Sequence, residues 1–124
     1  MSGIKKRILA VDDAPENLQF IVALLKDKYS VVVATSGQKA LDIAKNSKPD
    51  LILLDIIMPQ MDGYEVCRLL KSDLDTSSIP VVFVTSKNDA FDDAIGYSVG
   101  ASAYIVKPIE PDVLRATVEA YLGE

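Results

Sequence analysis

The stretch LILLDIIMPQMDG, residues 51–63, places a carboxylate directly after an apolar run of strand length. A continuous apolar run of four residues is typical of a strand that is covered on both faces of a sheet. Asp55 follows at once, although burying an ionised carboxylate away from water is costly. This position is reasonable if the strand ends here and Asp55 lies at an edge of the sheet.

Four other apolar runs of strand length occur in the chain, and segments with helical periodicity lie between them. Strands are predicted over residues 8–11, 31–34, 51–54, 81–84 and 104–106, all covered on both faces. Apolar residues recur at helical spacing at Leu18, Ile21, Val22 and Leu25, at Val66, Leu69 and Leu70, and at Leu114, Val118, Tyr121 and Leu122. Five repeats of strand and helix predict one α/β domain over residues 1–124, with a parallel sheet and helices on both faces.

Helix start signals support this order of elements. Pro15 and Pro111 suit the first turn of a helix. Asp62 with Glu65 is similar to a capping box in which Asp62 replaces the usual Ser or Thr. The caps predicted for two further helices are Ser36-Gly37 and either Asn88 or Asp89.

The composition excludes several classes of site. The 124 residues include no histidine and one cysteine, so a zinc site, an internal disulfide and catalysis by a Ser-His or Cys-His pair are not expected. Cys67 lies in an apolar helical pattern and is interpreted as structural. The net charge of −5 speaks against direct binding of nucleic acid. No apolar stretch approaches the roughly 18 residues of a membrane span, so we expect a cytoplasmic protein.

Polar residues end the predicted strands. In a parallel sheet these ends share one edge, and ligands bind there where the strand order reverses. Three acids at that edge would repel one another, and a hard divalent cation such as Mg²⁺ would neutralise them. A lysine and a hydroxyl beside the metal would make a site for a phosphoryl group. The residues expected to converge are Asp12, Asp13, Asp55, Thr85 and Lys107.

Each of these residues also has a purely structural interpretation. Asp13 could cap the helix that begins near Pro15, and Asp55 could be an acid in a turn at the strand end. Thr85 could cap a turn, and Lys107 could be a solvated lysine. Their joint placement at one edge favours the functional interpretation.

The set resembles the receiver domain of bacterial response regulators over about residues 8–122. The motifs that carry the resemblance are VDD (11–13), DIIMPQMDG (55–63), VTS (84–86) and AYIVKP (103–108). The resemblance implies a flavodoxin-like fold with strand order 2-1-3-4-5. It also implies a cis bond between Lys107 and Pro108 that aims Lys107 into the site. In the loop after Asp55, Pro59 and Gly63 are expected to shape the backbone, with Gly63 in a conformation that other residues find costly.

By the same resemblance, Asp55 is the phosphoryl acceptor, and its carboxylate attacks phosphorus to form an aspartyl phosphate. The implied cofactor is Mg²⁺. Asp13 would bind it directly, Asp12 through water, and Asp55 and the backbone carbonyl of Ile57 would complete the protein's share of ligands.

Lys107 and the Thr85 hydroxyl are implied to contact the phosphoryl oxygens, with help from the Ser86 amide. Thr85 and Tyr104 match the family's switch pair. When phosphorylation draws the hydroxyl toward the phosphoryl group, the aromatic ring turns inward. The alternative is that Tyr104 is an ordinary strand aromatic.

The implied phosphodonor is a histidine kinase or a phosphotransfer protein. The implied output is a protein target or output domain bound by the face of the fourth helix, fifth strand and fifth helix, or a phosphorylation-dependent homodimer. DDAPENL (12–18) and MDGYEVC (61–67) are also similar to receivers that head multidomain cyclic-dinucleotide proteins. By the same resemblance, a receiver domain is not a turnover enzyme, because it catalyses only its own phosphorylation and dephosphorylation.

Three other functions are alternatives to this one. A haloacid-dehalogenase-like phosphatase normally has a second acid two residues after its nucleophile, and here that position is Ile57. A nucleotide or flavin binder is not supported, because neither GxGxxG nor GxxxxGK[ST] occurs. A phosphorylation-independent interaction domain stays an alternative, although the intact acidic set speaks against it.

Overall fold

The computed structural model describes residues 4–86 and 93–123, in which strands and helices alternate as predicted. The strands are β1 (Arg7–Val11), β2 (Ser30–Ala34), β3 (Leu51–Asp55), β4 (Val81–Ser86) and β5 (Ala103–Lys107). The helices are α1 (Pro15–Leu25), α2 (Gly37–Ser47), α3 (Gly63–Ser72), α4 (Asp93–Ser98) and α5 (Pro111–Leu122).

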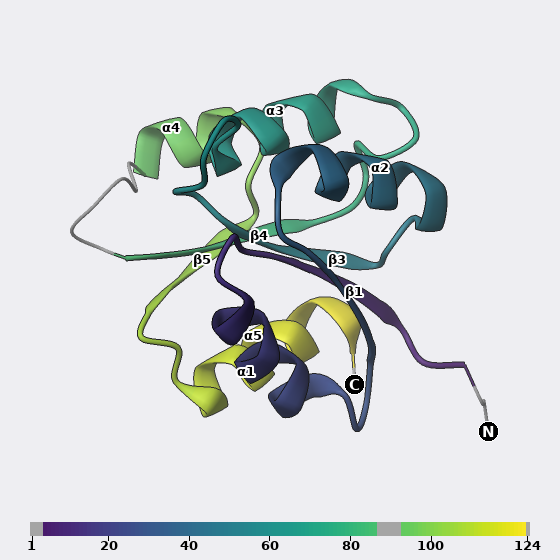
Figure 1. Ribbon diagram of the computed structural model, residues 1–124. Coiled ribbons are helices and arrows are strands. Elements are labelled where there is room, and N and C mark those ends of the chain that lie inside the picture. Colours follow the sequence, from purple (N-terminus) through teal and green to yellow (C-terminus); the bar gives the residue numbers. More distant parts are fainter. Residues whose placement is uncertain (1–3, 87–92, 124) are drawn as a thin grey trace.

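The five strands form one parallel sheet in the order β2-β1-β3-β4-β5, which confirms the predicted topology. Helices α1 and α5 cover one face of the sheet, and α2, α3 and α4 cover the other (Figure 1). The strand order reverses beside β1, where the chain goes out to β2 and returns to β3. The carboxyl ends of β1 and β3 are therefore neighbours at the place where such folds bind ligands.

Each face of the sheet has its own apolar core, because successive side chains of a strand point to opposite faces. Leu9, Ile52 and Phe83 pack toward α2 and α3. Ile8 and Leu53 pack toward α1 and α5. The inner strands are thus buried on both sides, as their continuous apolar runs predict.

Strand β2 departs from the expectation that every strand is covered on both faces. It is an edge of the sheet, and in the described residues it pairs with β1 alone. Val32 and Val33 are 39% and 41% exposed. An apolar run by itself does not distinguish an inner strand from an edge strand, because the order of strands is a property of the whole sheet.

Two of the predicted helix caps are confirmed. The Ser36 side chain accepts a hydrogen bond from the Lys39 amide, and the Asp62 side chain accepts one from the Glu65 amide. The predicted caps Asn88 and Asp89 lie outside the described residues.

The alternative interpretation of Asp13, as the N-cap of α1, is wrong. Ala14 occupies the N-cap of α1, no side chain caps this helix, and Pro15 begins it. Pro111 likewise begins α5. The carboxylate of Asp13 is therefore left for another role.

Some apolar residues of the predicted helical patterns are not fully buried. Val22 on α1 is only partly buried, and Tyr121 on α5 is 37% exposed. None of the helices in the described ranges is long and apolar enough to cross a membrane.

Candidate functional site

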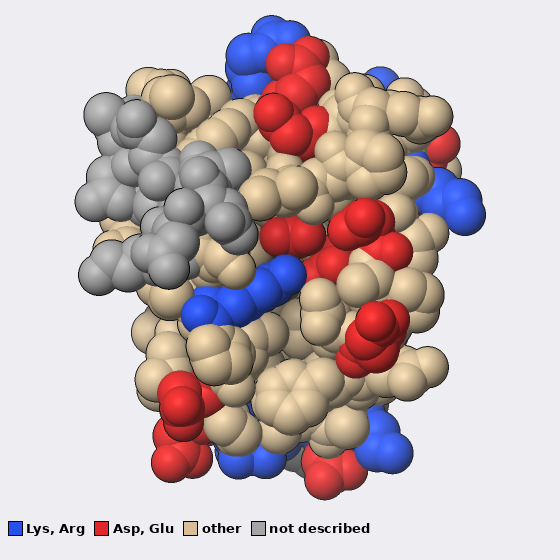
Figure 2. Space-filling view, turned by 60° about the vertical axis from the view of Figure 1, so that its left-hand side comes forward, with Lys and Arg blue, Asp and Glu red and all other residues tan. Residues whose placement is uncertain are grey.

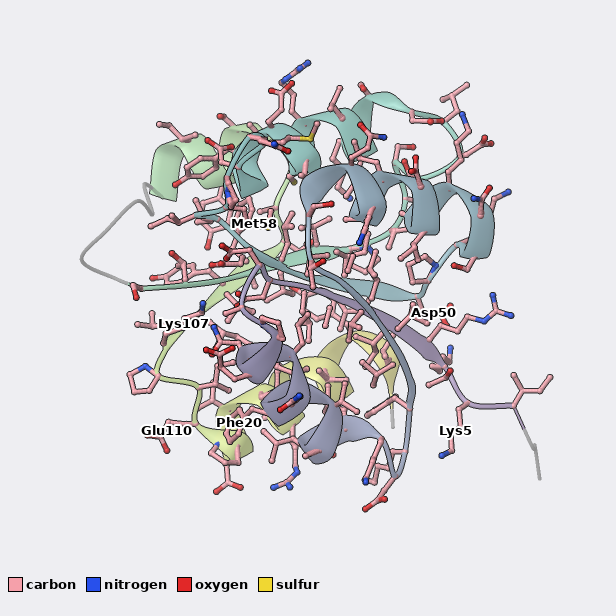
Figure 3. All side chains as sticks on the ribbon, in the orientation of Figure 1. Lys5, Phe20, Asp50, Met58, Lys107 and Glu110 are labelled. Carbon is pink, nitrogen blue, oxygen red and sulfur yellow. The ribbon has the colours of Figure 1, made fainter. Side chains whose placement is uncertain are left out.

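The carboxyl ends of the strands bring the predicted site residues to one edge of the sheet. Asp12 and Asp13 directly follow β1, and Asp55 is the last residue of β3. Lys107 is the last residue of β5 and lies at the opposite end of the sheet from Asp50 and Lys5 (Figure 3). The strands are parallel, so these residues share an edge although they are far apart in sequence.

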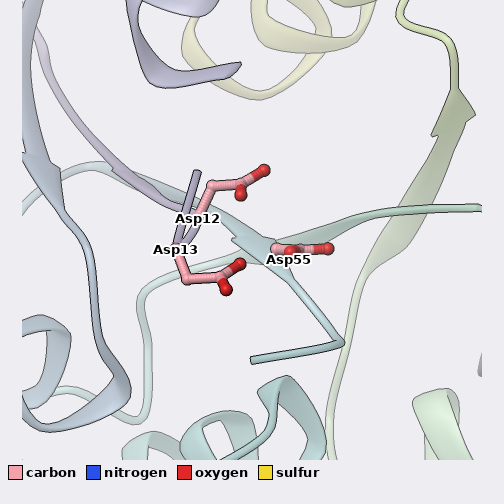
Figure 4. Close-up of side chains that lie close together, drawn as sticks. All are labelled: Asp12, Asp13 and Asp55. Atoms are coloured by element: carbon pink, nitrogen blue, oxygen red, sulfur yellow. The ribbon is translucent and has the colours of Figure 1, made fainter. Parts of the chain in front are cut away.

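Three carboxylates meet at this edge. Asp12, Asp13 and Asp55 each offer an oxygen atom, and these atoms all lie within 4.8 Å of one another (Figure 4). Asp12 and Asp55 are buried at 3% and 6% exposure, whereas Asp13 is exposed. Acidic side chains gather in the middle of this face of the molecule, with a basic side chain directly beside them (Figure 2).

The Asp12 carboxylate is tied to the start of α1. One oxygen accepts a hydrogen bond from the Ala14 amide at 2.9 Å, and the other accepts one from Asn17 Nδ2 at 3.1 Å. Asn17 is not among the site residues predicted from the sequence. The sequence feature that could have identified Asn17 is its place in the first turn of the helix that follows the acid pair. From there its side chain can reach back to the strand end.

Lys107 compensates part of the negative charge. Its Nζ lies 3.1 Å from Asp12 Oδ2 and 3.4 Å from Asp55 Oδ1. Burial by itself lowers the pKa of Lys107. The hydrogen bonds and negative charges of the two carboxylates outweigh burial, so the pKa of Lys107 is raised. Three carboxylates and one ammonium still leave an excess of negative charge, which favours a bound cation.

The environment of Asp55 raises the pKa of its carboxyl group. Burial has the largest effect and raises this pKa, and the negative charge of Asp12 raises it further. Lys107 and the hydrogen bond from the Ile56 amide lower the pKa. The net direction is upward. A buried carboxylate with a raised pKa at a ligand-binding edge is typical of a functional site.

Thr85 and Ser86 end β4 beside Lys107. Ser86 pairs with Lys107 in the ladder between β4 and β5, and Asp55 pairs with Val84 in the ladder between β3 and β4. Thr85 is 1% exposed, and its hydroxyl donates a hydrogen bond to the Ser86 carbonyl at 3.3 Å. This long contact to a neighbouring residue leaves the hydroxyl free to change partner at small cost.

The loop after β3 is tightened by Gly63. Its amide donates to the Ile56 carbonyl at 2.7 Å. A Cβ at Gly63 would lie only 2.3 Å from the backbone oxygen of Asp55. The expectation of an unusual conformation at Gly63 is wrong, because the residue with positive φ in this loop is Gln60, at 71°. Gly63 is needed for close approach of two backbones instead.

The remaining predicted residues lie around this centre. Ile57 follows in the same loop, with its apolar side chain 50% exposed where a phosphatase of the dehalogenase type would carry an acid. Tyr104 lies on β5 opposite Phe83 and is 38% exposed. The bond between Lys107 and Pro108 is cis, as predicted.

Cys67 is structural, as interpreted from its pattern. Its side chain is fully buried, and Sγ donates to the Val99 carbonyl at 3.4 Å. Burial raises the pKa of the thiol to about 11, so it is an inert thiol at neutral pH.

The geometry agrees with a comparison to known families. The model of the response regulator receiver domain matches residues 8–119. The chain belongs to this family. Receiver domains are signalling modules of two-component systems, and they are typically not enzymes.

Relatives share this receiver domain over nearly its whole length. Protein PilH of Pseudomonas aeruginosa is 38% identical over 118 residues, which cover 94% of this chain and 98% of PilH. The receiver domain of the sensor histidine kinase PA1611 of P. aeruginosa, solved with a magnesium ion in its active-site cleft, superimposes with a TM-score of 0.87 at 26% identity. That match covers 97% of this chain and 99% of the other.

Other relatives are much longer than this receiver domain. A Vibrio cholerae protein named "Probable cyclic di-GMP phosphodiesterase" is 41% identical over 115 residues, which are 93% of this chain but 26% of that protein. The chain spans about half, 53%, of the mycobacterial DNA-binding response regulator MtrA.

Proposed function

We propose that this receiver domain accepts a phosphoryl group on Asp55 and thereby changes its affinity for a partner. The observation that carries the proposal is the setting of Asp55. Its buried carboxylate lies within reach of two other acids and 3.4 Å from Lys107. No structural need explains three acids gathered around one lysine at the carboxyl edge of a sheet.

The donor set fits Mg²⁺. Asp12, Asp13 and Asp55 offer carboxylate oxygens, which this hard cation prefers, and the backbone carbonyl of Ile57 would add a further oxygen. The excess negative charge of the cluster is the electrostatic reason for a cation to bind. When bound, Mg²⁺ would offset the charge on the phosphoryl oxygens.

The chain's own residues carry the transfer. A carboxylate oxygen of Asp55 attacks phosphorus, and the new O–P bond forms as the bond from phosphorus to the donor breaks. Lys107, which bridges Asp12 and Asp55, would move to the phosphoryl oxygens. The Thr85 hydroxyl and the Ser86 amide would donate to the same oxygens. Positioning and charge compensation therefore supply most of the catalysis.

The given residues include no histidine, so the phosphodonor histidine lies outside this receiver domain. A histidine kinase or a phosphotransfer protein fits this role. A hollow of about 420 Å³ beside the site gives a donor side chain room to approach. Its walls are formed by Asn17, Phe20, Ser86, Lys107, Pro108 and Ile109.

The output face is the surface of α4, β5 and α5. Thr85 and Tyr104 would couple the site to this face, because they lie on the neighbouring strands β4 and β5, with Tyr104 two residues further from the carboxyl edge in the ladder. The face would bind a protein target or output domain, or a second phosphorylated copy. Its exposed apolar side chains are Ile95, Tyr97, Tyr104, Val113 and Tyr121.

The first prediction tests the acceptor. With Mg²⁺ and acetyl phosphate, the protein should gain one phosphoryl group, seen by intact mass spectrometry and removed by hydroxylamine as expected for an acyl phosphate. Asp55→Asn should abolish the gain, because an amide does not attack phosphorus. The matched control is Asp27→Asn, at an exposed aspartate that follows α1 at the other end of the sheet. Labelling of Asp55→Asn at the wild-type rate would place the acceptor elsewhere.

A further inference from the structure

The β2 edge of the sheet lacks the charged residues, proline and bulges that often protect an open strand. Edge strands are normally blunted by charged residues, proline or bulges. Residues 29–38 contain no charged residue and no proline, and β2 pairs with β1 in unbroken register. The opposite edge differs, because β5 ends in Lys107.

The backbone groups that β2 presents outward can be identified from its ladder. The Ser30 amide donates to the Lys6 carbonyl, and the Ala34 carbonyl accepts from the Asp12 amide. Residues 30, 32 and 34 therefore direct their polar groups toward β1. The groups of consecutive residues in a strand alternate, so the N–H and C=O of Val31 and Val33 point to the open edge.

An apolar groove runs beside this edge, on the face covered by α1. It has a volume of about 380 Å³ and is walled by Val33 and by one side of α1, including Leu18, Val22 and Ala23. Val32 is 39% exposed on the opposite face of the strand. A strand added to β2 would thus find hydrogen-bond partners along the edge and apolar surface on both sides.

The charges along the groove suit an antiparallel copy of the same surface. Pro15 and Thr35 line the groove near the carboxyl end of β2, with Glu16 next to Pro15 in the first turn of α1, and Lys26 lines the groove at its other end. A two-fold axis through Val32 would place the Glu16 end of one copy against the Lys26 end of the other. The interface is self-complementary in both charge and backbone hydrogen bonding.

We propose that two copies of this chain associate through their β2 edges, which extends the sheet across a two-fold axis at Val32. Val31 of each copy would pair with Val33 of the partner subunit, and each pair would exchange both N–H···O bonds. The side chains of Val32 would meet across the axis. This interface lies at the opposite edge of the sheet from β5, so it is separate from the proposed output face.

Amide hydrogen exchange measured by NMR, from micromolar to millimolar protein, tests the pairing in the wild-type chain. Exchange at Val31 and Val33 should slow at least about tenfold at high concentration, because only the dimer gives these amides a partner. The amides of Val32 and Ala34, which face β1, are the internal control and should not change. Exchange at Val31 and Val33 that is independent of concentration would overturn the proposal.

Sedimentation equilibrium on two variants gives an independent test. Val33→Lys should weaken association at least about tenfold, because a lysine on an edge strand opposes pairing. The matched control, Leu74→Lys, replaces a side chain that is 94% exposed outside the β2 edge and should associate like the wild type. A wild type that stays monomeric at millimolar concentration, or a Val33→Lys variant that associates as tightly as wild type, would overturn the proposal.

Discussion

At the residue scale, the acids of the site differ in how firmly they are tied to the fold. Asp12 is buried and accepts hydrogen bonds from Ala14, Asn17 and Lys107. Asp13 is exposed and does not cap α1. Substitutions at these two positions therefore separate the structural role of an acid from its role toward a cation.

The second prediction concerns Asp13→Ala and Asp12→Ala. Asp13→Ala should weaken Mg²⁺ binding more than Asp12→Ala and leave the stability of the metal-free protein equal or slightly higher, because it removes repulsion and breaks no cap. Asp12→Ala should lower the free energy of unfolding by about 1–3 kcal/mol, since it leaves the part-buried donors of Ala14 and Asn17 without this partner. Urea unfolding with and without Mg²⁺ measures both effects.

The control for this comparison is Glu16→Ala, which removes a nearby exposed negative charge outside the acidic cluster. It should change Mg²⁺ affinity much less than Asp13→Ala. A large loss of stability in Asp13→Ala with unchanged Mg²⁺ affinity would contradict the role assigned to Asp13.

At the element scale, the junction between β3 and α3 holds Asp55, the proposed acceptor, in place. Gly63 begins α3 directly against the backbone of Asp55, so the helix start and the strand end are in contact. The hydrogen bond that the Glu65 amide donates to the Asp62 carboxylate secures the same turn. The geometry of Asp55 thus depends on where α3 begins.

The third prediction is that Gly63→Ala lowers the free energy of unfolding by about 1–3 kcal/mol, the usual cost of overpacking. It should also slow phosphorylation, because the added Cβ displaces the backbone of Asp55. Gly37→Ala is the matched control, since the three atoms nearest its Cβ belong to the side chains of Val66 and Met61 rather than to backbone. Equal losses of stability in the two variants would contradict the importance of the backbone contact.

The fourth prediction concerns the pair of strands β4 and β5. Thr85→Ala should still be phosphorylated, but its response should be weak, because it lacks the hydroxyl that we propose links the phosphoryl group to β5. The phosphoryl group can shift an equilibrium only by its different interaction with the two states. Amide NMR shifts on addition of a phosphoryl mimic should reach Tyr104 in wild type and not in Thr85→Ala. Shifts confined to the loops around Asp55 in wild type would exclude this route.

At the scale of the whole molecule, the site lowers stability when no cation is bound. Burial and the charge of Asp12 raise the pKa of Asp55 above the ordinary 3.8. The folded protein therefore binds this proton more tightly than the unfolded chain does. The stabilisation from Asp55 is present below pH 3.8 and is lost as the pH rises through the raised pKa.

The fifth prediction follows from this loss of stability with rising pH. In EDTA, the free energy of unfolding of Asp55→Asn should exceed that of wild type, and the difference should grow as the pH rises from about 4 to neutrality. Saturating Mg²⁺ should reduce the difference, because the cation stabilises only the wild-type cluster. Urea titrations across this pH range measure it. A difference that is constant with pH would show that the ionisation of Asp55 does not destabilise the fold.

Much of the fold and of the site could be predicted from the sequence because the relevant signals are local. The apolar runs predicted the strands, and Ser36 and Asp62 marked helix starts that the structure confirms. Asp55 and Lys107 were found because a polar residue directly after a buried strand is conspicuous. Asn17 was missed, because its contact with Asp12 depends on how α1 leaves β1.

The sequence by itself determined the alternation of strands and helices and the set of polar residues at the carboxyl edge, since periodicity and strand ends are written along the chain. Only the tertiary structure decided that Lys107 bridges Asp12 and Asp55, that Gly63 serves a backbone contact, and that the apolar run of β2 lies at an open edge. These facts depend on which strands are neighbours. Neighbours in a sheet are set by the packing of the whole chain, whereas local sequence specifies only that a strand forms.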